Sequence, residues 1–257
     1  MSESAFFIVM QNITFLLSMG IIFDITLRSW QTSNRWRRRA ILGVIVGTIG
    51  IILMGAPWIT TENLRIDTRS ILLSVSGLFF GFLPTAIAMI MTSIYRLILG
   101  GAVFTGIMLI VLTGMLGILW RWLRKNSLLN LKWWQLYIFG IIVHLVMIIN
   151  AFTQPVDIAI ITIKRIFVPV MVIYPVVVTL LGMLMLNRLR REKDAEDLQR
   201  NQTRLMTMVD ILQYPIDAIQ SFVDFAMEEA IKLTESKLGF IFYYSEETRI
   251  FTLSAWS

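Results

Sequence analysis

The chain has 257 residues, of which 56% are hydrophobic and 16% are charged, and its formal net charge is +6. A soluble domain carries about 25% charged residues, so this composition excludes an ordinary globular protein and indicates side chains that face lipid. The basic residues cluster beside apolar runs, which is typical of membrane topology and not of a nucleic-acid-binding face. No cysteine is present, which excludes disulfides, thiolate catalysis and cysteine-based metal sites.

Five apolar segments are long enough to cross a bilayer, which needs about 20 residues per helix. They are Ala5–Leu27, Ala40–Trp58, Val103–Trp120, Trp133–Ala151 and Ile166–Leu186. The first has no basic segment before it and is followed by Arg28 and Arg35–Arg39. This order favours an uncleaved anchor over a signal peptide.

A sixth apolar stretch, Ile71–Leu99, allows two interpretations, because GLFFGFLP (Gly77–Pro84) interrupts it. It is either one span or two short helices that enter the membrane and return. A returning hairpin places 13 basic residues on the cytoplasmic side and 5 outside, as the positive-inside rule requires. We therefore predict an all-α polytopic membrane protein of the plasma membrane with five crossings and a broken Gly/Pro hairpin. The N-terminus then lies outside and the C-terminus in the cytoplasm; six helices is the alternative.

The chain becomes polar and helix-favouring over Asn187–Gln213, where Leu198, Leu205 and Leu212 recur every seven residues. This spacing predicts a short coiled coil, suited to a dimeric signalling helix. The tail then predicts a helix and two strands, at Asp217–Thr234, Phe240–Tyr244 and Arg249–Ala255. A two-stranded sheet on one helix cannot close a core, so we expect an incomplete α+β domain. The predicted parts are a membrane domain (1–186), a linker (187–213) and this tail (217–257).

Three charged residues flank the predicted hairpin. Asp67 and Arg69 precede it and Arg96 closes it, so a returning hairpin brings both arginines to one outer rim. Two guanidiniums beside a recess of low dielectric match a small carboxylate, and Asp67 would orient one of them. The alternative is that the arginines are interfacial anchors that extend to the headgroups. Residues expected to let helices approach, or a ligand reach the backbone, are Gly77, Gly81, Pro84, Gly100 and Gly101.

The chain shows no nucleophile–base pair, metal motif or nucleotide fingerprint. We therefore expect no catalytic residue, no metal and no cofactor in it. His144 lies midway along its span and has no second ligand-type residue three or four positions away. A hydrogen bond to a neighbouring backbone or polar group is the expected role for this side chain, rather than metal binding.

Three ordered motifs resemble the five-transmembrane sensor domain of LytS/YhcK-type receptors over roughly Ile41 to Leu186. They are D-T-R at Asp67–Arg69, GLFFGFLP at Gly77–Pro84 and YRLILGGAVFTG at Tyr95–Gly106. One departure is Phe82, which follows the second motif glycine where the family pattern has Gly-Pro. The tail, Asp224–Ser257, resembles the opening helix and first two strands of a GAF domain.

The resemblance implies the membrane sensor of a two-component signal-transduction protein. Such sensors precede cytoplasmic GAF, PAS, kinase or diguanylate-cyclase modules, and LytS-type members are associated with cell-wall and autolysis control. It also implies that Asp67, Arg69 and Arg96 match the family's charged positions. The chain has no histidine phosphorylation box and no ATP-binding motif, so histidine kinase activity would belong to further domains of a parent protein.

The partners expected on this reading are the lipid bilayer, a second copy of the chain, a small anionic ligand and a downstream kinase and response regulator. No nucleic acid is expected. Two rival functions are a transporter-like protein that binds a substrate and a dimerising anchor without a ligand.

Overall fold

The computed structural model describes Thr14 and residues 35–55, 58–61, 64–66, 68–124, 128–213, 219–234 and 236–256. The chain divides into two compact units, Met1–Arg190 and Arg191–Ser257. Apart from Thr14, the predicted first span Ala5–Leu27 lies outside the described residues, as does Asp67.

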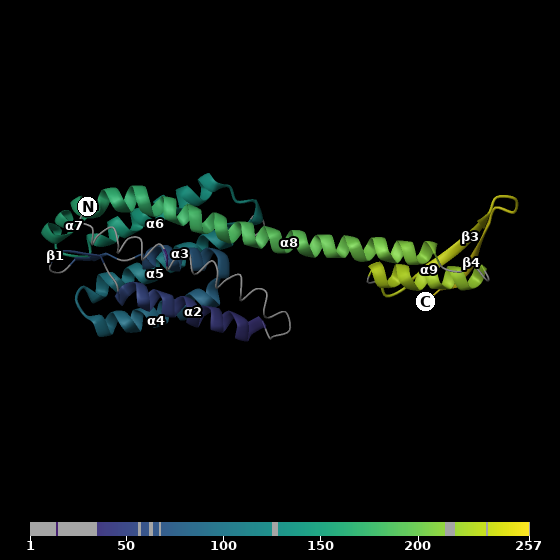
Figure 1. Ribbon diagram of the computed structural model, residues 1–257, viewed down its shortest axis with the longest axis horizontal. Helices are drawn as coiled ribbons and strands as arrows, with labels where there is room; N and C mark the ends of the chain where they lie inside the picture. Colours follow the sequence, from purple (N-terminus) through teal and green to yellow (C-terminus); the bar gives the residue numbers. More distant parts are fainter. Residues whose placement is uncertain are drawn as a thin grey trace. The chain divides into compact units, whose positions relative to one another are not determined.

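The first unit is a bundle of helices (Figure 1). Its helices are α2 (Arg35–Gly55), α3 (Arg69–Phe80), α4 (Phe82–Leu99), α5 (Val103–Leu123), α6 (Trp133–Ala151), α7 (Val156–Val168) and the beginning of α8 (Tyr174–Leu212). Four short elements join them: the antiparallel strands β1 (Trp58–Thr61) and β2 (Leu64–Ile66), the 3-10 turn η1 (Leu128–Asn130) and the π-helical turn η2 (Pro169–Ile173).

Five of the described helices, α2, α4, α5, α6 and α8, are long and apolar enough to cross a membrane. The predicted class of helical multi-pass membrane protein is thus confirmed. The set of spans differs from the predicted one, because α4 lies inside the predicted hairpin and has 18 residues. The predicted span Ile166–Leu186 is also interrupted: α7 ends at Val168 and the π turn begins at Pro169, whose ring has no N–H to continue a helix.

Close approaches at glycines give the directions of the helices. A Cβ on Gly43 would meet Pro84 and Ile87, and one on Gly50 would meet Thr92, so α2 and α4 run the same way (Figure 1). In α3, Gly77 approaches Gly114 of α5, while Arg121, further along α5, reaches the end of α3. Because α3 therefore runs with α5 and against α4, the hairpin returns to the side it left.

We name the two ends of the bundle by their residues. The basic end holds Arg37–Arg39, Arg121, Arg124, Lys132, Arg188 and Arg190, the last of which donates to the carbonyls of Leu129 and Leu131. The distal end holds β1, β2, the start of α3 and the ends of α4 and α6. The hairpin begins and finishes at the distal end.

The hairpin breaks at Gly81, whose φ of +83° is a conformation that glycine adopts readily. The last carbonyls of a helix lack intrahelical donors, and in an apolar bundle the protein must supply them. Arg121 Nη1 donates to the carbonyls of Leu78 (3.0 Å) and Phe79 (2.7 Å). Thr85 Oγ1 donates to the Gly81 carbonyl at 2.8 Å. Pro84 lies inside the first turn of α4, where its missing N–H costs nothing.

Helix α3 lies in the core, and every residue from Arg69 to Phe79 is buried. Its serines are bonded within the hairpin: Ser74 donates to the Ile71 carbonyl, and Ser76 lies 3.0 Å from the Thr85 hydroxyl. A Cβ on Gly77 would lie 2.7 Å from the Gly114 carbonyl oxygen. Helices approach this closely only where side chains are small, so the contact between α3 and α5 depends on these glycines.

The second unit contains the rest of α8, helix α9 (Ile219–Thr234) and the antiparallel strands β3 (Phe240–Ser245) and β4 (Ile250–Trp256). The predicted helix and strands match these within a few residues. Met227 and Ala255 are buried, whereas Phe242, Tyr243 and Phe251 are exposed. The two strands and one helix therefore leave much of their apolar surface uncovered, as expected for a sheet of this size.

Replacing Arg121 with Met should destabilise the bundle by about 2–3 kcal/mol, because the two carbonyls at the end of α3 lose a charged donor. Thermal unfolding of the purified protein in detergent measures this. The matched control is Arg124→Met, since the Arg124 side chain makes no hydrogen bond to the described residues. Equal losses in the two variants would contradict the capping role of Arg121.

Candidate ligand site at the distal end of the hairpin

Arg69 is the first residue of α3 and is only 6% exposed. Its neighbours are buried as well, with Thr68 at 4% and Ser70 at 1%. The first turn of the helix is closed by the amides of Ile71 and Leu72, which donate to the Thr68 carbonyl at 3.1 and 3.2 Å. A charged side chain at such a place is expensive and commonly marks a functional site in a membrane protein.

The two hydroxyls beside Arg69 are buried and make no hydrogen bond to the described residues. These are Thr68 Oγ1 and Ser70 Oγ. Buried polar groups nearly always have a partner, so two such hydroxyls on either side of a buried guanidinium need an explanation. The start of α3 also carries the positive end of the helix dipole. Together these groups make the start of α3 a candidate site for an anion.

Arg96 has a contact that its sequence position does not reveal. It lies in the last turn of α4, and its Nη2 donates to the Ala102 carbonyl at 3.2 Å. The turn that it spans contains Gly100 and Gly101, whose φ angles of +67° and +76° suit glycine. Its side chain lies against Gly106, where a larger residue would collide with it. Arg96 thus holds together the connection between α4 and α5.

Both arginines lie at the distal end. A Cβ on Gly50 would meet both Leu72 and Thr92, so these two residues lie at the same height in the bundle. Arg69 comes one turn before Leu72 in α3, and Arg96 comes one turn after Thr92 in α4. Because α3 and α4 run in opposite directions, both steps lead toward the distal end. The two arginines are therefore at a similar height. The third predicted member of the site, Asp67, is outside the described residues.

A polar network joins α5 and α6 at the same end. Asn150 Nδ2 donates to the Thr105 carbonyl at 3.0 Å, and the hydroxyls of Thr105 and Thr153 are 2.7 Å apart. Asn150 Oδ1 is buried and has no hydrogen bond to the described residues. The distal end thus contains several polar groups inside an otherwise apolar bundle.

Thr68, Ser70 and Arg121 were not among the residues predicted to form the site. The first two flank Arg69 in the chain, and a polar Thr-Arg-Ser run directly before an apolar helix was the available signal. No such signal existed for Arg121, because its partners lie 42 and 43 positions earlier.

His144 is buried, and its Nδ1 lies 2.6 Å from the Gly140 carbonyl. This contact agrees with the expected backbone hydrogen bond. The ring also meets the ring of Tyr174 edge-on, with centroids 5.2 Å apart. Tyr174 is the first residue of α8, directly after the π turn, so His144 marks the contact of α6 with the start of that helix. Among the described residues, no group of three potential ligands could hold a metal ion.

A family model described as "5TMR of 5TMR-LYT" matches residues 9–188. No curated protein and no solved structure matches the chain. The matched range contains the hairpin and the membrane part of every span described above, and the resemblance seen in the hairpin motifs is confirmed. The GAF-like tail lies outside it. This family is a sensor domain of histidine kinases. The chain therefore belongs to the 5TMR-LYT family and contains its multi-pass membrane sensor domain.

Proposed function

We propose that this chain is the membrane input module of a sensor histidine kinase and that it detects a small anionic ligand at the distal end. The observation that carries the proposal is the buried Arg69 at the start of α3, between two buried hydroxyls without a partner among the described residues. Family membership supports the sensor role. The ligand and the relay are our inference.

A carboxylate fits the chemistry of this site. The planar fork of a guanidinium donates two parallel hydrogen bonds to a carboxylate. The hydroxyls of Thr68 and Ser70 can each donate one more, and the start of α3 attracts negative charge. Burial of all three residues limits the ligand to a small molecule. Arg96 is the second cation in this proposal, and Asp67 would orient one of the two guanidiniums.

Helix α8 is the proposed output of the sensor. It runs without interruption from Tyr174 to Leu212, and so belongs to both units. Its first turns pack on α6, where Pro175 contacts Gly140 and Gly182 contacts Leu136. A ligand shifts such an assembly only through its different affinities for two states, with a typical coupling of about 1–3 kcal/mol.

A dimer is proposed because α8 has an apolar row that the described residues leave exposed. Leu198, Leu205 and Leu212 recur every seven residues and are 59%, 63% and 82% exposed. A seam of this spacing is covered when two helices wind around each other. A homodimer would also let a rotation of α8 reach both copies of a cytoplasmic output domain.

The orientation follows from charge. Cytoplasmic loops of membrane proteins carry an excess of lysine and arginine, so we assign the basic end to the cytoplasm. The distal end, with the candidate ligand site, then lies on the outer side of the plasma membrane. The N-terminus is assigned to the outside and the C-terminus to the cytoplasm on the same ground.

The proposed ligand site predicts that substitution of Arg69 weakens the binding of a carboxylate. Short mono- and dicarboxylates of two to four carbons are screened for an increase in melting temperature of the purified protein. Arg69→Ala should weaken the binding of an active compound by at least about tenfold, the equivalent of one lost charged hydrogen bond. Thr68→Val should weaken it less, and the control Lys164→Ala, at an exposed lysine of α7, should not change it.

Undiminished binding to Arg69→Ala would exclude this site. Accumulation of the active compound in proteoliposomes would favour the transporter-like alternative. If no carboxylate binds and an unrelated membrane anchor preserves signalling, the chain is a dimerising anchor.

The dimer predicts efficient cross-linking through the leucine row. Because the chain has no native cysteine, Leu205→Cys in membranes should form a disulfide-linked dimer under mild oxidation. Arg200→Cys, on the opposite side of the same helix, serves as the control and should form little dimer. Equal cross-linking of the two variants would show that the leucine row is not the interface.

The orientation predicts which loops react with a membrane-impermeant maleimide in intact cells. Ala102→Cys lies in the exposed turn at the distal end and should be labelled from outside. Asn130→Cys, exposed at the basic end, should react only after the cells are permeabilised. The reverse pattern would place the candidate ligand site on the cytoplasmic side.

A further inference from the structure

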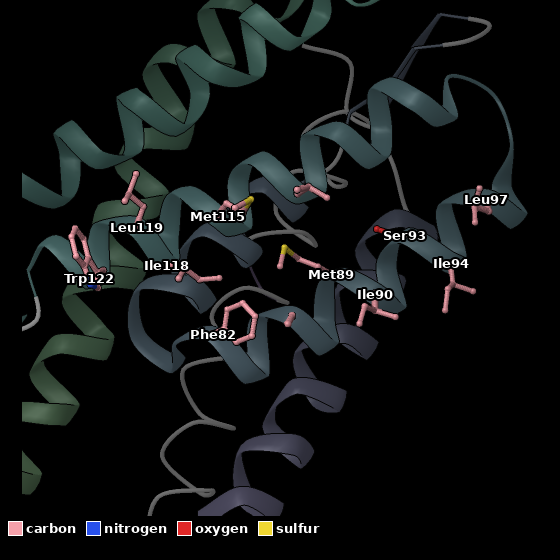
Figure 2. Close-up of a pocket in the computed structure, with 12 residues that line it drawn as sticks. Phe82, Met89, Ile90, Ser93, Ile94, Leu97, Met115, Ile118, Leu119 and Trp122 are labelled. Atoms are coloured by element: carbon pink, nitrogen blue, oxygen red, sulfur yellow. The ribbon is translucent and has the colours of Figure 1, made fainter.

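An apolar groove lies between α4 and α5 on an exposed face of the bundle. Its volume is about 660 Å³, within the range of roughly 300–1,000 Å³ typical of small-molecule sites. Figure 2 shows its twelve lining side chains, which come from both helices and are apolar or aromatic except for Ser93. Phe82 and Trp122 lie at its basic end and are 69% and 72% exposed.

This groove is on the least covered part of the membrane bundle. Only 22% of the α4 span and 28% of the α5 span are buried, against 44% of each of the other three described spans. The lining runs from Phe82 to Leu97 along α4, which is about 22 Å of helix. One leaflet of the hydrocarbon core is about 15 Å thick, so a lipid acyl chain fits lengthwise in the groove.

Two arginines lie at the basic end of the bundle, outside the lining of the groove but next to it in α2 and α5. Arg121 directly precedes Trp122, and its Nη1 is bonded to the carbonyls at the end of α3. A guanidinium has five N–H donors, so Arg121 retains donors on Nε and Nη2 for another acceptor. Arg39 lies one turn before Gly43 in α2, and Gly43 contacts Pro84 at the start of α4, so Arg39 is near the same end of α4. Its positive charge acts against that of Arg121.

The described part of the bundle offers these arginines no counter-charge. Between Arg35 and Arg190, the only described carboxylate side chain is that of Asp157. It lies in the first turn of α7, which follows the distal end of α6. Basic pockets between membrane helices on the cytoplasmic side commonly bind anionic headgroups. The groove itself is apolar, and the basic groups beside it are Arg39 and Arg121, at the end that the proposed orientation assigns to the cytoplasm.

We infer that the groove binds one anionic glycerophospholipid, with an acyl chain between α4 and α5 and its phosphate at Arg121 and Arg39. A second copy of the chain is a poorer occupant. Copies of a membrane protein insert with the same orientation, so a symmetric contact here would bring a second Arg39 and Arg121 to the same height and add like charge. A phosphate supplies a negative charge that the described residues at this end do not provide. Because Arg121 also caps α3, the lipid stabilises the break of the hairpin.

Native mass spectrometry of the purified full chain in detergent tests the inference. The probes are dioleoylphosphatidylglycerol, which is anionic, and dioleoylphosphatidylcholine, which has no net charge. The anionic lipid should bind about tenfold more tightly, as expected for a phosphate beside two arginines. It should also raise the melting temperature more than the neutral lipid does.

Groove variants make the test specific. Ala86→Phe and Ser93→Phe each fill the groove, and Arg39→Gln removes charge without touching the cap of α3. Each should reduce the affinity for the anionic lipid to nearly that for the neutral lipid. The controls are Leu180→Phe, on an exposed membrane face of α8, and Arg37→Gln, which is exposed beside Arg39; both should bind like the unchanged protein.

Equal retention of the two lipids would overturn the inference, because it would show ordinary annular lipid. Full retention of the anionic lipid by both filling variants would overturn it as well. If the filling variants no longer dimerise but still bind the anionic lipid, the groove is an interface between two copies of the chain and is not the lipid site. Two filling positions are used so that a folding defect in one variant does not decide the result.

Discussion

The guanidinium of Arg121 is the interaction on which the arrangement of the hairpin depends. A helix that ends inside an apolar bundle leaves carbonyl groups without donors, and lipid cannot supply them. Arg121 satisfies two of these carbonyls from α5, and Thr85 satisfies that of Gly81. Because α3 can end there, α4 is free to return along α2. The common location of Arg69 and Arg96 at the distal end follows from this cap.

Because α3 is buried, the charge of Arg69 at its start is costly to desolvate. A leucine in place of Arg69 would cost less to bury, since charges carry a large desolvation penalty. The helix is also packed backbone to backbone against α5 at Gly77, so α3 cannot move without disturbing α5 or the bonds to Arg121. An anion bound at the start of α3 would thus act on a rigid element that is fixed at its far end.

Much of the architecture was predictable from local pattern. Charge counting predicted a returning hairpin, segments bounded by turn residues predicted the strands of the tail, and the heptad pattern predicted the helical linker. One kind of failure concerns the partners of the arginines. Arg121 was counted only as a topological charge, and Arg96 only as a rim cation, because their backbone partners depend on the folded arrangement.

Two details of the helix boundaries were not predicted, each for a physical reason. Pro84 was grouped with Gly81 although a proline fits the first turn of a helix, and the α4 that results is long enough to span a membrane. Pro169 was included in one continuous span although it begins a π turn. Hydrophobicity predicts which segments lie in the membrane, whereas backbone hydrogen bonding decides where each helix stops.

The π turn is where a change in the bundle can reach α8. Such turns contain an extra residue per hydrogen-bonded ring and are often found at functional sites. Helix α6 lies between this turn and the distal end: Asn150 bonds to α5, whereas His144 and Gly140 contact Tyr174 and Pro175. In the relay proposed above, a displacement of α5 at the distal end would be carried by α6 to the first turn of α8. One residue of register between π and α geometry would correspond to a rotation of α8 by about 100°, enough to turn Leu198, Leu205 and Leu212 toward or away from a second copy.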